Sequence, residues 1–170
     1  MIIVTVDSKH YAPLVRFLRG LDKGTTHAYT HFGYVVRNPA QSARRILEAI
    51  HDGQMFGYAL VHENRILGFG HLDLFAKKEK KHVVKLGLVL HQRYQGKGLG
   101  KRLLDSMIRA ARKMGVEKVW LATYADNTRA LQLYLSRGFA VEGIFRKEER
   151  IDGRYRDVMS MALFLKPGCD

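Results

Sequence analysis

The hydrophobic positions of this chain follow two periods, and each period predicts one kind of secondary structure. In four segments apolar residues recur every three or four positions, as on one face of a helix: His10–Leu21, Pro39–Gly53, Leu99–Met114 and Thr128–Arg137. In seven others the residues are branched and apolar or alternate with polar ones, which predicts strands: Ile2–Val6, Met55–Val61, Ile66–Leu74, Val83–Leu90, Val116–Thr123, Phe139–Ile151 and Arg154–Leu165.

The order of these elements predicts the fold class. Four strands precede the helix Leu99–Met114, one strand lies between the last two helices, and two strands close the series. This order differs from the regular alternation of strands and helices that indicates a parallel sheet. We therefore predict an α/β (α+β) fold: a mixed, mostly antiparallel, twisted sheet of about seven strands flanked on both faces by about four helices. The 170 residues are expected to form a single domain, residues 1–170.

A glycine-rich turn, Gln95–Gly100, joins the strand Val83–Leu90 to the helix that follows. The first turn of a helix presents backbone N–H groups without an internal partner, and the helix dipole adds partial positive charge there. Glycines remove the side chains that would keep a phosphate away from these groups. Lys97, Lys101 and Arg102 add full positive charges. The stretch predicts a phosphate or pyrophosphate site, although a glycine pattern alone also fits a plain surface turn.

The spacing of the glycines distinguishes between phosphate-binding loops. No Gly-Lys pair is followed by Ser or Thr, which excludes the nucleoside-triphosphatase loop. Gly96, Gly98 and Gly100 give G-x-G-x-G and not the dinucleotide pattern G-x-G-x-x-G. From Gln95 to Gly100 the sequence reads Q-x-x-G-x-G, which resembles the acetyl-CoA pyrophosphate loop of the GNAT (Gcn5-related) N-acetyltransferases. The predicted order of elements resembles the fold of that family along nearly the whole chain.

A second stretch, Asn127–Phe139, resembles the family pattern N-x-x-A-x-x-x-Y-x-x-x-G-F. Ala130 and Tyr134 are four residues apart and share one helix face. The resemblance implies that Tyr134 protonates the departing CoA thiolate as general acid, which suits a phenol because its reference pKa of about 10 exceeds that of a thiol, about 8.5. It also implies that Asn127 hydrogen-bonds the cofactor. Taken alone, Tyr134 also fits a buried core tyrosine, and Asn127 also fits a helix cap. The presence of the two motifs in their expected order favours the functional interpretation.

The resemblance implies both a reaction and a cofactor site. The reaction is transfer of the acetyl group from acetyl-CoA, without a metal, to a primary amine by direct attack in a ternary complex. The amine would belong to a small molecule, a protein N-terminus or a lysine. The residues expected to bind acetyl-CoA lie at the end of the central strand, in the glycine loop and on the later helix: Leu88, Val89, Leu90, Gln95, Gly96, Lys97, Gly98, Leu99, Gly100, Asn127 and Tyr134.

The sequence leaves open which base deprotonates the amine. Some relatives carry a carboxylate on the central strand, whereas this strand carries Lys85 and Gly87 and no acid. The candidates elsewhere are Asp73 and His71, which share a face of the preceding strand, and Glu142. Side chains of these kinds are more often solvated or ion-paired than catalytic. A chain of water molecules is a further alternative.

The C-terminal stretch Glu142–Met161 resembles a subgroup pattern, G-x-x-R…D/N-G-x-Y-x-D-x-x-x-M. That subgroup includes phosphinothricin, amino-acid and ribosomal-protein-alanine acetyltransferases, which differ mainly in their acceptor. The resemblance implies a homodimer formed through this region and does not choose the amine. Acceptor contacts are expected from two segments, Asp22–Asn38 and Arg146–Arg156, and from Asp73. The candidate wall residues are Tyr29, His31, Tyr34 and Tyr124.

The composition indicates an alternative function and a location in the cell. The 29 Lys and Arg residues exceed the 16 Asp and Glu residues, a net charge of +13, so a non-catalytic acyl-CoA- or nucleic-acid-binding module is the alternative. The sequence lacks a clustered basic stripe with interleaved aromatics, and the run Lys77–Lys81 fits an exposed hairpin tip, so nucleic acid is not the expected partner. The one cysteine, Cys169, excludes an internal disulfide. With no apolar run near the ~20 residues of a membrane span, we expect a cytoplasmic protein.

Overall fold

The structure of the chain is a computed structural model, and it describes residues 1–21, 38–151 and 153–165. The described strands are β1 (Ile2–Thr5), β2 (Met55–His62), β3 (Arg65–Leu74), β4 (Val83–Leu90), β5 (Lys118–Tyr124), β6 (Ala140–Ile151) and β7 (Arg154–Phe164). The described α-helices are α1 (Tyr11–Arg19), α2 (Pro39–His51), α3 (Leu99–Lys113) and α4 (Thr128–Leu135). Each observed boundary lies within two residues of the predicted one, the usual uncertainty at element ends. No helix in the described ranges is long and apolar enough to cross a membrane.

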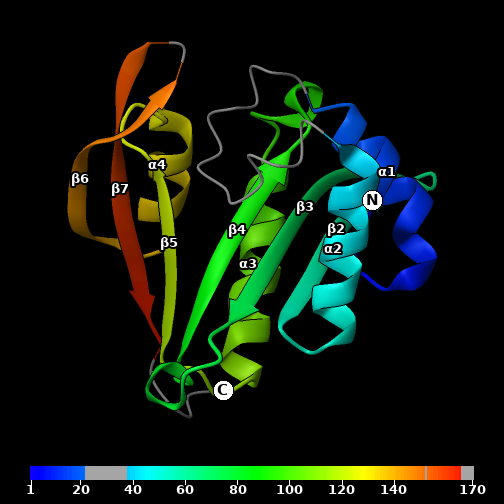
Figure 1. Cartoon of the computed structure of the whole chain (residues 1–170), viewed down its shortest axis with the longest axis horizontal. Coiled ribbons are helices and arrows are strands. Elements are labelled where there is room, and N and C mark those ends of the chain that lie inside the picture. The colour runs from blue at the N-terminus through cyan, green and yellow to red at the C-terminus, as the bar shows by residue number, and fades with distance from the viewer. Residues whose placement is uncertain (22–37, 152, 166–170) are drawn as a thin grey trace.

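The strands form one sheet in the order β1-β2-β3-β4-β5-β7-β6, which Figure 1 shows with α1 and α2 against one half. Every neighbouring pair is antiparallel except β4 and β5, which run parallel. The helix α3 connects this parallel pair, as a crossover between parallel strands requires. The mixed, mostly antiparallel sheet predicted from the sequence is confirmed.

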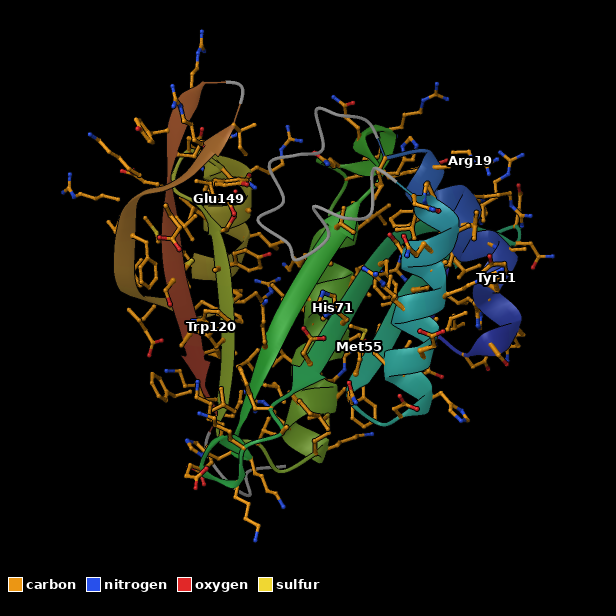
Figure 2. The ribbon with its side chains drawn as sticks, viewed as in Figure 1. Tyr11, Arg19, Met55, His71, Trp120 and Glu149 are labelled. Carbon is orange, nitrogen blue, oxygen red and sulfur yellow. The ribbon has the colours of Figure 1, made fainter. Side chains whose placement is uncertain are left out.

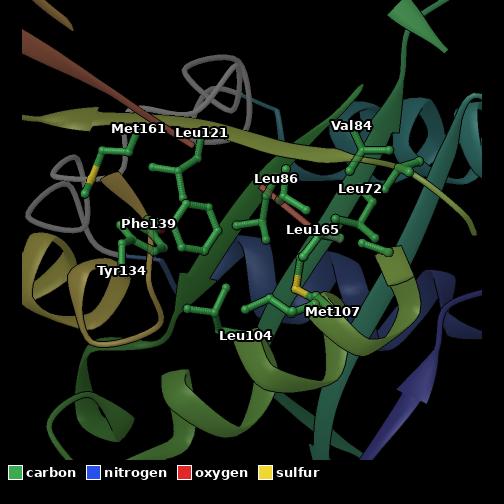
Figure 3. Close-up of a cluster of buried hydrophobic side chains, with 14 of the residues drawn as sticks. Leu72, Val84, Leu86, Leu104, Met107, Leu121, Tyr134, Phe139, Met161 and Leu165 are labelled. Carbon is green, nitrogen blue, oxygen red and sulfur yellow. The ribbon is translucent and has the colours of Figure 1, made fainter. Parts of the chain in front are cut away.

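Each face of the sheet carries its own hydrophobic core, because successive strand residues point to opposite faces. On one face Leu72 and Leu86 pack with Met107 of α3 and with Tyr134 of α4, as Figure 3 shows. On the other face Phe69 packs with residues of α1 and α2. The prediction that helices cover both faces is confirmed. Within β3 and within β4, residues with even numbers and residues with odd numbers point to opposite faces.

Two helix starts, those of α2 and α4, have a side-chain cap, whereas that of α3 has none. Asn38 caps α2, because its Oδ1 accepts a hydrogen bond from a first-turn N–H at 3.1 Å and Pro39 occupies the first helical position. Asn127 caps α4, with Oδ1 accepting from the N–H of Ala130 at 3.2 Å. The helix α3 begins after Gly98, whose backbone is left-handed, and has no side-chain cap. Of these three starts, only that of α3 leaves its first-turn N–H groups without a side-chain acceptor.

The strand β6 departs from the continuous strand predicted at Phe139–Ile151. Its pairing with β7 shifts register between Phe145 and Glu149, and Lys147 there has a positive φ of 52°. The Lys147 N–H donates to Asp157 Oδ1 at 2.7 Å, so a carboxylate of β7 stabilises the bulge. A bulge resets the alternation of side chains, and Glu149 beyond it is half-buried.

Candidate functional site

The parallel strands at the centre of the sheet separate part of the way along their length. They pair only where Val83–Lys85 faces Lys118–Trp120. Beyond that point β4 stays with β3 as far as Leu90, and β5 stays with β7 as far as Tyr124. Figure 1 shows the two halves of the sheet diverging above this point. Within the described part of the chain, the β5 side of Leu86–Leu90 has no strand partner, so alternate backbone N–H and C=O groups there can serve a ligand.

A cleft of about 810 Å³ occupies the gap between β4 and β5. This volume lies in the range of small-molecule sites. Nine of the eleven residues expected at the cofactor site line the cleft: Leu88, Val89, Leu90, Gln95, Gly96, Gly98, Gly100, Asn127 and Tyr134. The two motifs, about thirty residues apart in the chain, therefore meet at one site.

The glycine loop presents bare backbone to the cleft. Gly96 and Gly98 have φ angles of 74° and 73°, in the left-handed region that favours glycine. A Cβ atom at either position would meet no atom within 4 Å, so the space beside the loop is open. The first-turn N–H groups of α3 follow directly and lack partners within the helix. With the positive end of the helix dipole, this geometry suits a phosphate.

Gln95 ties the loop to both walls of the cleft. Its Nε2 donates to the Leu90 carbonyl at 3.2 Å, and its Oε1 accepts from Arg129 Nη1 at 2.9 Å. The first bond closes the loop onto β4, and the second fixes Arg129 of α4 at the cleft wall. Arg129 and Lys101 both line the cleft and provide two cations for an anionic ligand. The sequence motif does not specify which residue stands at position 129, so Arg129 is identified as a cleft residue by its contact with Gln95 in the structure.

Three other side chains near the loop lie away from the cleft. Leu99 is buried in a core cluster with residues of β2 and β3, so only its backbone remains for a ligand. The Lys97 ammonium lies 5.7 Å from the centre of the Tyr94 ring, and the residue is not part of the lining. Arg102 donates to a main-chain carbonyl at the N-terminus at 3.4 Å. Of the three cations noted in the sequence, only Lys101 lies at the cleft.

Tyr134 belongs both to the core and to the cleft wall. Its ring centre lies 5.6 Å from that of Phe139, and Figure 3 shows both rings beside Leu121 and Met161. Burial raises the pKa of the Tyr134 phenol, so the hydroxyl stays protonated at neutral and mildly alkaline pH. Asn127 likewise caps α4 and lines the cleft. Both residues therefore have a structural role, and both lie at the wall of the cleft.

Two of the three candidate bases are neighbours, and the third is elsewhere. On β3, His71 Nδ1 and Asp73 Oδ1 lie 2.7 Å apart. Glu142 instead pairs with Lys118 at 2.6 Å, at the end of β5 where it still pairs with β4. Glu142, His71 and Asp73 are all absent from the residues that line the cleft.

A second polar cluster lies where the hairpin of β6 and β7 meets the open end of β5. The Tyr124 hydroxyl donates to Glu149 Oε2 at 2.5 Å, and the Arg156 guanidinium stacks on the Tyr124 ring at 4.3 Å and pairs with Asp126 at 2.5 Å. Asp126 lines the cleft. Sequence reasoning named Tyr124 but missed Glu149, because the bulge that turns it inward carries no clear sequence signal. Outside the described residues lie other predicted positions: Tyr29, His31, Tyr34, Cys169 and residues 22–37 of the segment Asp22–Asn38.

A family model matches most of the chain. The model described as the acetyltransferase (GNAT) family aligns with residues 23–139. That span includes the glycine loop Gln95–Gly100 and the motif Asn127–Phe139. The family resemblance noted in the sequence is therefore confirmed.

Curated relatives align with about half of the chain. The chain is 29% identical over 96 residues to L-amino acid N-acetyltransferase AaaT of Escherichia coli K12, covering 55% of this chain and 59% of that protein. It is 42% identical over 71 residues to the [ribosomal protein bS18]-alanine N-acetyltransferase of the same strain, covering 41% of this chain and 47% of that protein. The matched region thus spans about half the length of these relatives.

A solved structure matches the fold over the full length. The Salmonella typhimurium protein yncA, solved with its cofactor acetyl-CoA, superposes with a TM-score of 0.83 at 20% sequence identity. The match covers 100% of this chain and 96% of that one. At this identity the likeness establishes the fold and nothing finer.

Proposed function

The chain belongs to the GNAT acetyltransferase family, and on that premise we propose that it transfers an acetyl group from acetyl-CoA to a primary amine. The amine belongs to a small molecule or to a protein, at its N-terminus or on a lysine. One observation carries the proposal: the unpaired edge of β4, the uncapped start of α3 and the Tyr134 wall converge on one cleft.

The cleft offers acetyl-CoA two distinct surfaces. The free edge of β4 from Leu88 to Leu90 presents peptide groups that match the amides of an extended pantetheine arm. The loop at Gly96 and Gly98 and the start of α3 match a pyrophosphate. Arg129 at the wall adds a guanidinium, whose donors suit phosphate oxygens.

The reaction forms one bond and breaks another. The neutral amine nitrogen attacks the thioester carbonyl carbon, and the bond from that carbon to sulfur breaks. Backbone N–H groups of β4 stabilise the charge that develops on the carbonyl oxygen. The departing sulfur takes a proton from Tyr134, and the amine nitrogen gives a proton up to a base or to water. Return of that proton restores the Tyr134 hydroxyl, so atoms and charge balance. The buried phenol suits this role because its pKa stays above that of the thiol it protonates.

The two relatives guide the choice of acceptor. One is named for L-amino acids and the other for an alanine of a ribosomal protein, and these acceptors share an α-amine. We therefore expect amino acids and peptides with free N-termini to be better acceptors than polyamines, whose positive charges meet a chain of net charge +13.

The test measures free thiol released from acetyl-CoA with amino acids, N-terminal peptides, lysine peptides, polyamines and aminoglycosides. We expect release with at least one α-amine. Tyr134→Phe should lower kcat about 100-fold while acetyl-CoA affinity by calorimetry stays unchanged. The matched control is Tyr155→Phe, because Tyr155 is 59% exposed and outside the cleft lining. Binding of acetyl-CoA without release to any acceptor would favour the binding-module alternative, and full activity of Tyr134→Phe would remove Tyr134 as the acid.

A further inference from the structure

We propose that the outward face of helix α3 binds the phosphate backbone of a nucleic-acid duplex. The inference goes beyond the proposed acetyl transfer and does not rest on it. Five exposed cations form this face, which we call the α3 stripe: Lys101, Arg102, Arg109, Arg112 and Lys113. The 15 residues of the helix include a single carboxylate, Asp105, so the α3 stripe is a local excess of positive charge.

The helix separates its charged residues from its apolar ones. At 3.6 residues per turn, the five cations fall within an arc of about 120°. The buried residues occupy the opposite arc and pack in the core: Leu99, Leu103, Leu104, Met107, Ile108 and Ala111. With a rise of 1.5 Å per residue, the stripe from Lys101 to Lys113 is about 18 Å long. The five cations therefore lie along one continuous strip of exposed helix surface.

Little of this positive charge is neutralised within the protein. Asp105 accepts a hydrogen bond from Arg137 Nε at 2.6 Å, so the one carboxylate of α3 already has a cationic partner outside the stripe. Arg102 donates to a neutral main-chain carbonyl at 3.4 Å, which leaves its charge in place. Among residues 1–21, 38–151 and 153–165, no ion pair involves a cation of the α3 stripe. The stripe thus retains its charges for an external anion.

The chemistry of the α3 stripe favours nucleic acid over a membrane or a protein. The apolar side of α3 is buried in the core, so no apolar face remains to insert between lipids. In the described part of the chain, no exposed large hydrophobic side chain belongs to α3, whereas protein interfaces are centred on apolar or aromatic anchors. Nucleic-acid interfaces are instead polar and strongly positive. Three of the five cations are arginines, whose guanidinium groups bind phosphate through two hydrogen bonds.

The composition of the stripe favours a duplex that is bound without sequence preference. The helix α3 contains no aromatic residue on which the bases of a single strand could stack. It is therefore a basic stripe of a different kind from the one with interleaved aromatics that the sequence lacks. The helix also contains no Asn or Gln to bind base edges, so contacts to phosphates, which carry no sequence information, predominate. At 3.4 Å per nucleotide, a stripe of about 18 Å spans roughly five nucleotides of one strand.

The opposite side of the molecule provides a matched reference surface. Figure 1 shows α3 on one face of the sheet and α1 and α2 on the other. Arg16, Arg19 and Arg44 are exposed on α1 and α2, and Figure 2 shows Arg19 at the outer edge of the molecule beside α1. Lys101 lines the acetyl-CoA cleft and Arg102 contacts the N-terminus, so the test variants keep both residues.

The test measures, by fluorescence anisotropy without acetyl-CoA, binding of a labelled mixed-sequence DNA duplex of about 20 base pairs between about 50 and 200 mM salt. For five phosphate contacts, the slope of log K against log salt should be about −4.5 for the wild type. The stripe variant, Arg109→Gln/Arg112→Gln/Lys113→Gln, should reduce the slope to about −2 and bind at least ~30-fold more weakly at about 50 mM salt. Arg109→Gln alone should change the slope by about 1, so the test does not depend on the folding of the triple variant.

The control, Arg16→Gln/Arg19→Gln/Arg44→Gln, removes the same total charge from the opposite face. It should keep the wild-type slope and bind the duplex within about twofold of the wild type. Equal losses in the control and in the stripe variant would show an effect of net charge without a defined surface, and would overturn the proposal. Thermal unfolding reports whether each variant is folded, and Tm should stay unchanged because Gln is a good helix former at exposed positions.

Three further results would also overturn the proposal. They are a wild-type slope near zero, tighter binding of a single strand than of a duplex of equal length, and stripe-dependent binding to phosphatidylserine vesicles without binding to the duplex. Because the assay contains no acetyl-CoA and no acceptor amine, its outcome is separate from success or failure of the acetyl-transfer proposal.

Discussion

Replacing Gly87 with Ala should displace the His71 ring and destabilise the protein. The new methyl group would lie 2.7 Å from two ring carbons and closer still to Nε2, whereas ordinary contacts begin near 3.4 Å, so the ring must retreat by more than about 0.7 Å. The ring is fixed on its other side by the 2.7 Å hydrogen bond to Asp73. Overpacking of this kind costs about 2 kcal/mol. For a chain of this size that cost lowers Tm by roughly 4–8 °C.

A double-mutant cycle isolates the cause of this loss. Thermal unfolding is measured for Gly87→Ala, His71→Ala and the double variant. Without the ring, Gly87→Ala should cost less than about 0.5 kcal/mol, giving a coupling energy of at least ~1 kcal/mol. Gly143→Ala is the matched control, because a Cβ on this other strand glycine would meet nothing within 4 Å. Additive costs of the two substitutions, or an equal loss in Gly143→Ala, would refute the placement of the ring over Gly87.

Three further predictions concern the loop, the acid and the hairpin. Gly98→Glu should weaken acetyl-CoA binding, measured by calorimetry, at least ~100-fold. The control is Gly115→Glu at the other end of α3, where φ is a similar 71° and the space is equally open. This control should leave acetyl-CoA binding unchanged. The raised Tyr134 pKa contributes stability that is fully present below about pH 10 and disappears as pH rises further. The free energy of unfolding, measured in urea, should therefore fall more steeply at alkaline pH for the wild type than for Tyr134→Phe. We expect a second copy to cover the β6 face around Phe145, which is 51% exposed; Phe145→Arg should then halve the mass seen by light scattering, and an unchanged mass would contradict this.

Much of the site could be predicted because its chemistry is local in sequence. The loop Gln95–Gly100 combines a strand end, glycines with positive φ and a helix start, and each of these leaves a direct trace in the sequence. The Asn127 cap and the wall position of Tyr134 follow from spacing along one helix. The order of strands and helices likewise follows from periodicity, and the observed elements match it.

The features that could not be predicted depend on contacts between segments. The position of the His71 side chain depends on the register of three strands, which places Gly57 and Gly87 on either side of His71. Glu149 reaches Tyr124 because of the bulge in β6. The alternation of residues along β6 does not predict that shift in register. Lys97 and Leu99 lie within the motif, yet their side chains point to a neighbouring ring and to a core cluster, because side-chain direction in a tight loop depends on φ and ψ rather than on spacing.

The central claim is that this chain moves an acetyl group from sulfur to nitrogen. The most direct measurement follows isotope-labelled acetyl-CoA by NMR in the presence of the α-amine acceptor that releases most thiol. We predict that the thioester carbonyl signal disappears and that an amide carbonyl signal grows at the same rate, and that both changes slow in Tyr134→Phe. Conversion to free acetate without an amide signal, or a thioester signal that persists although acetyl-CoA is bound, would contradict the account.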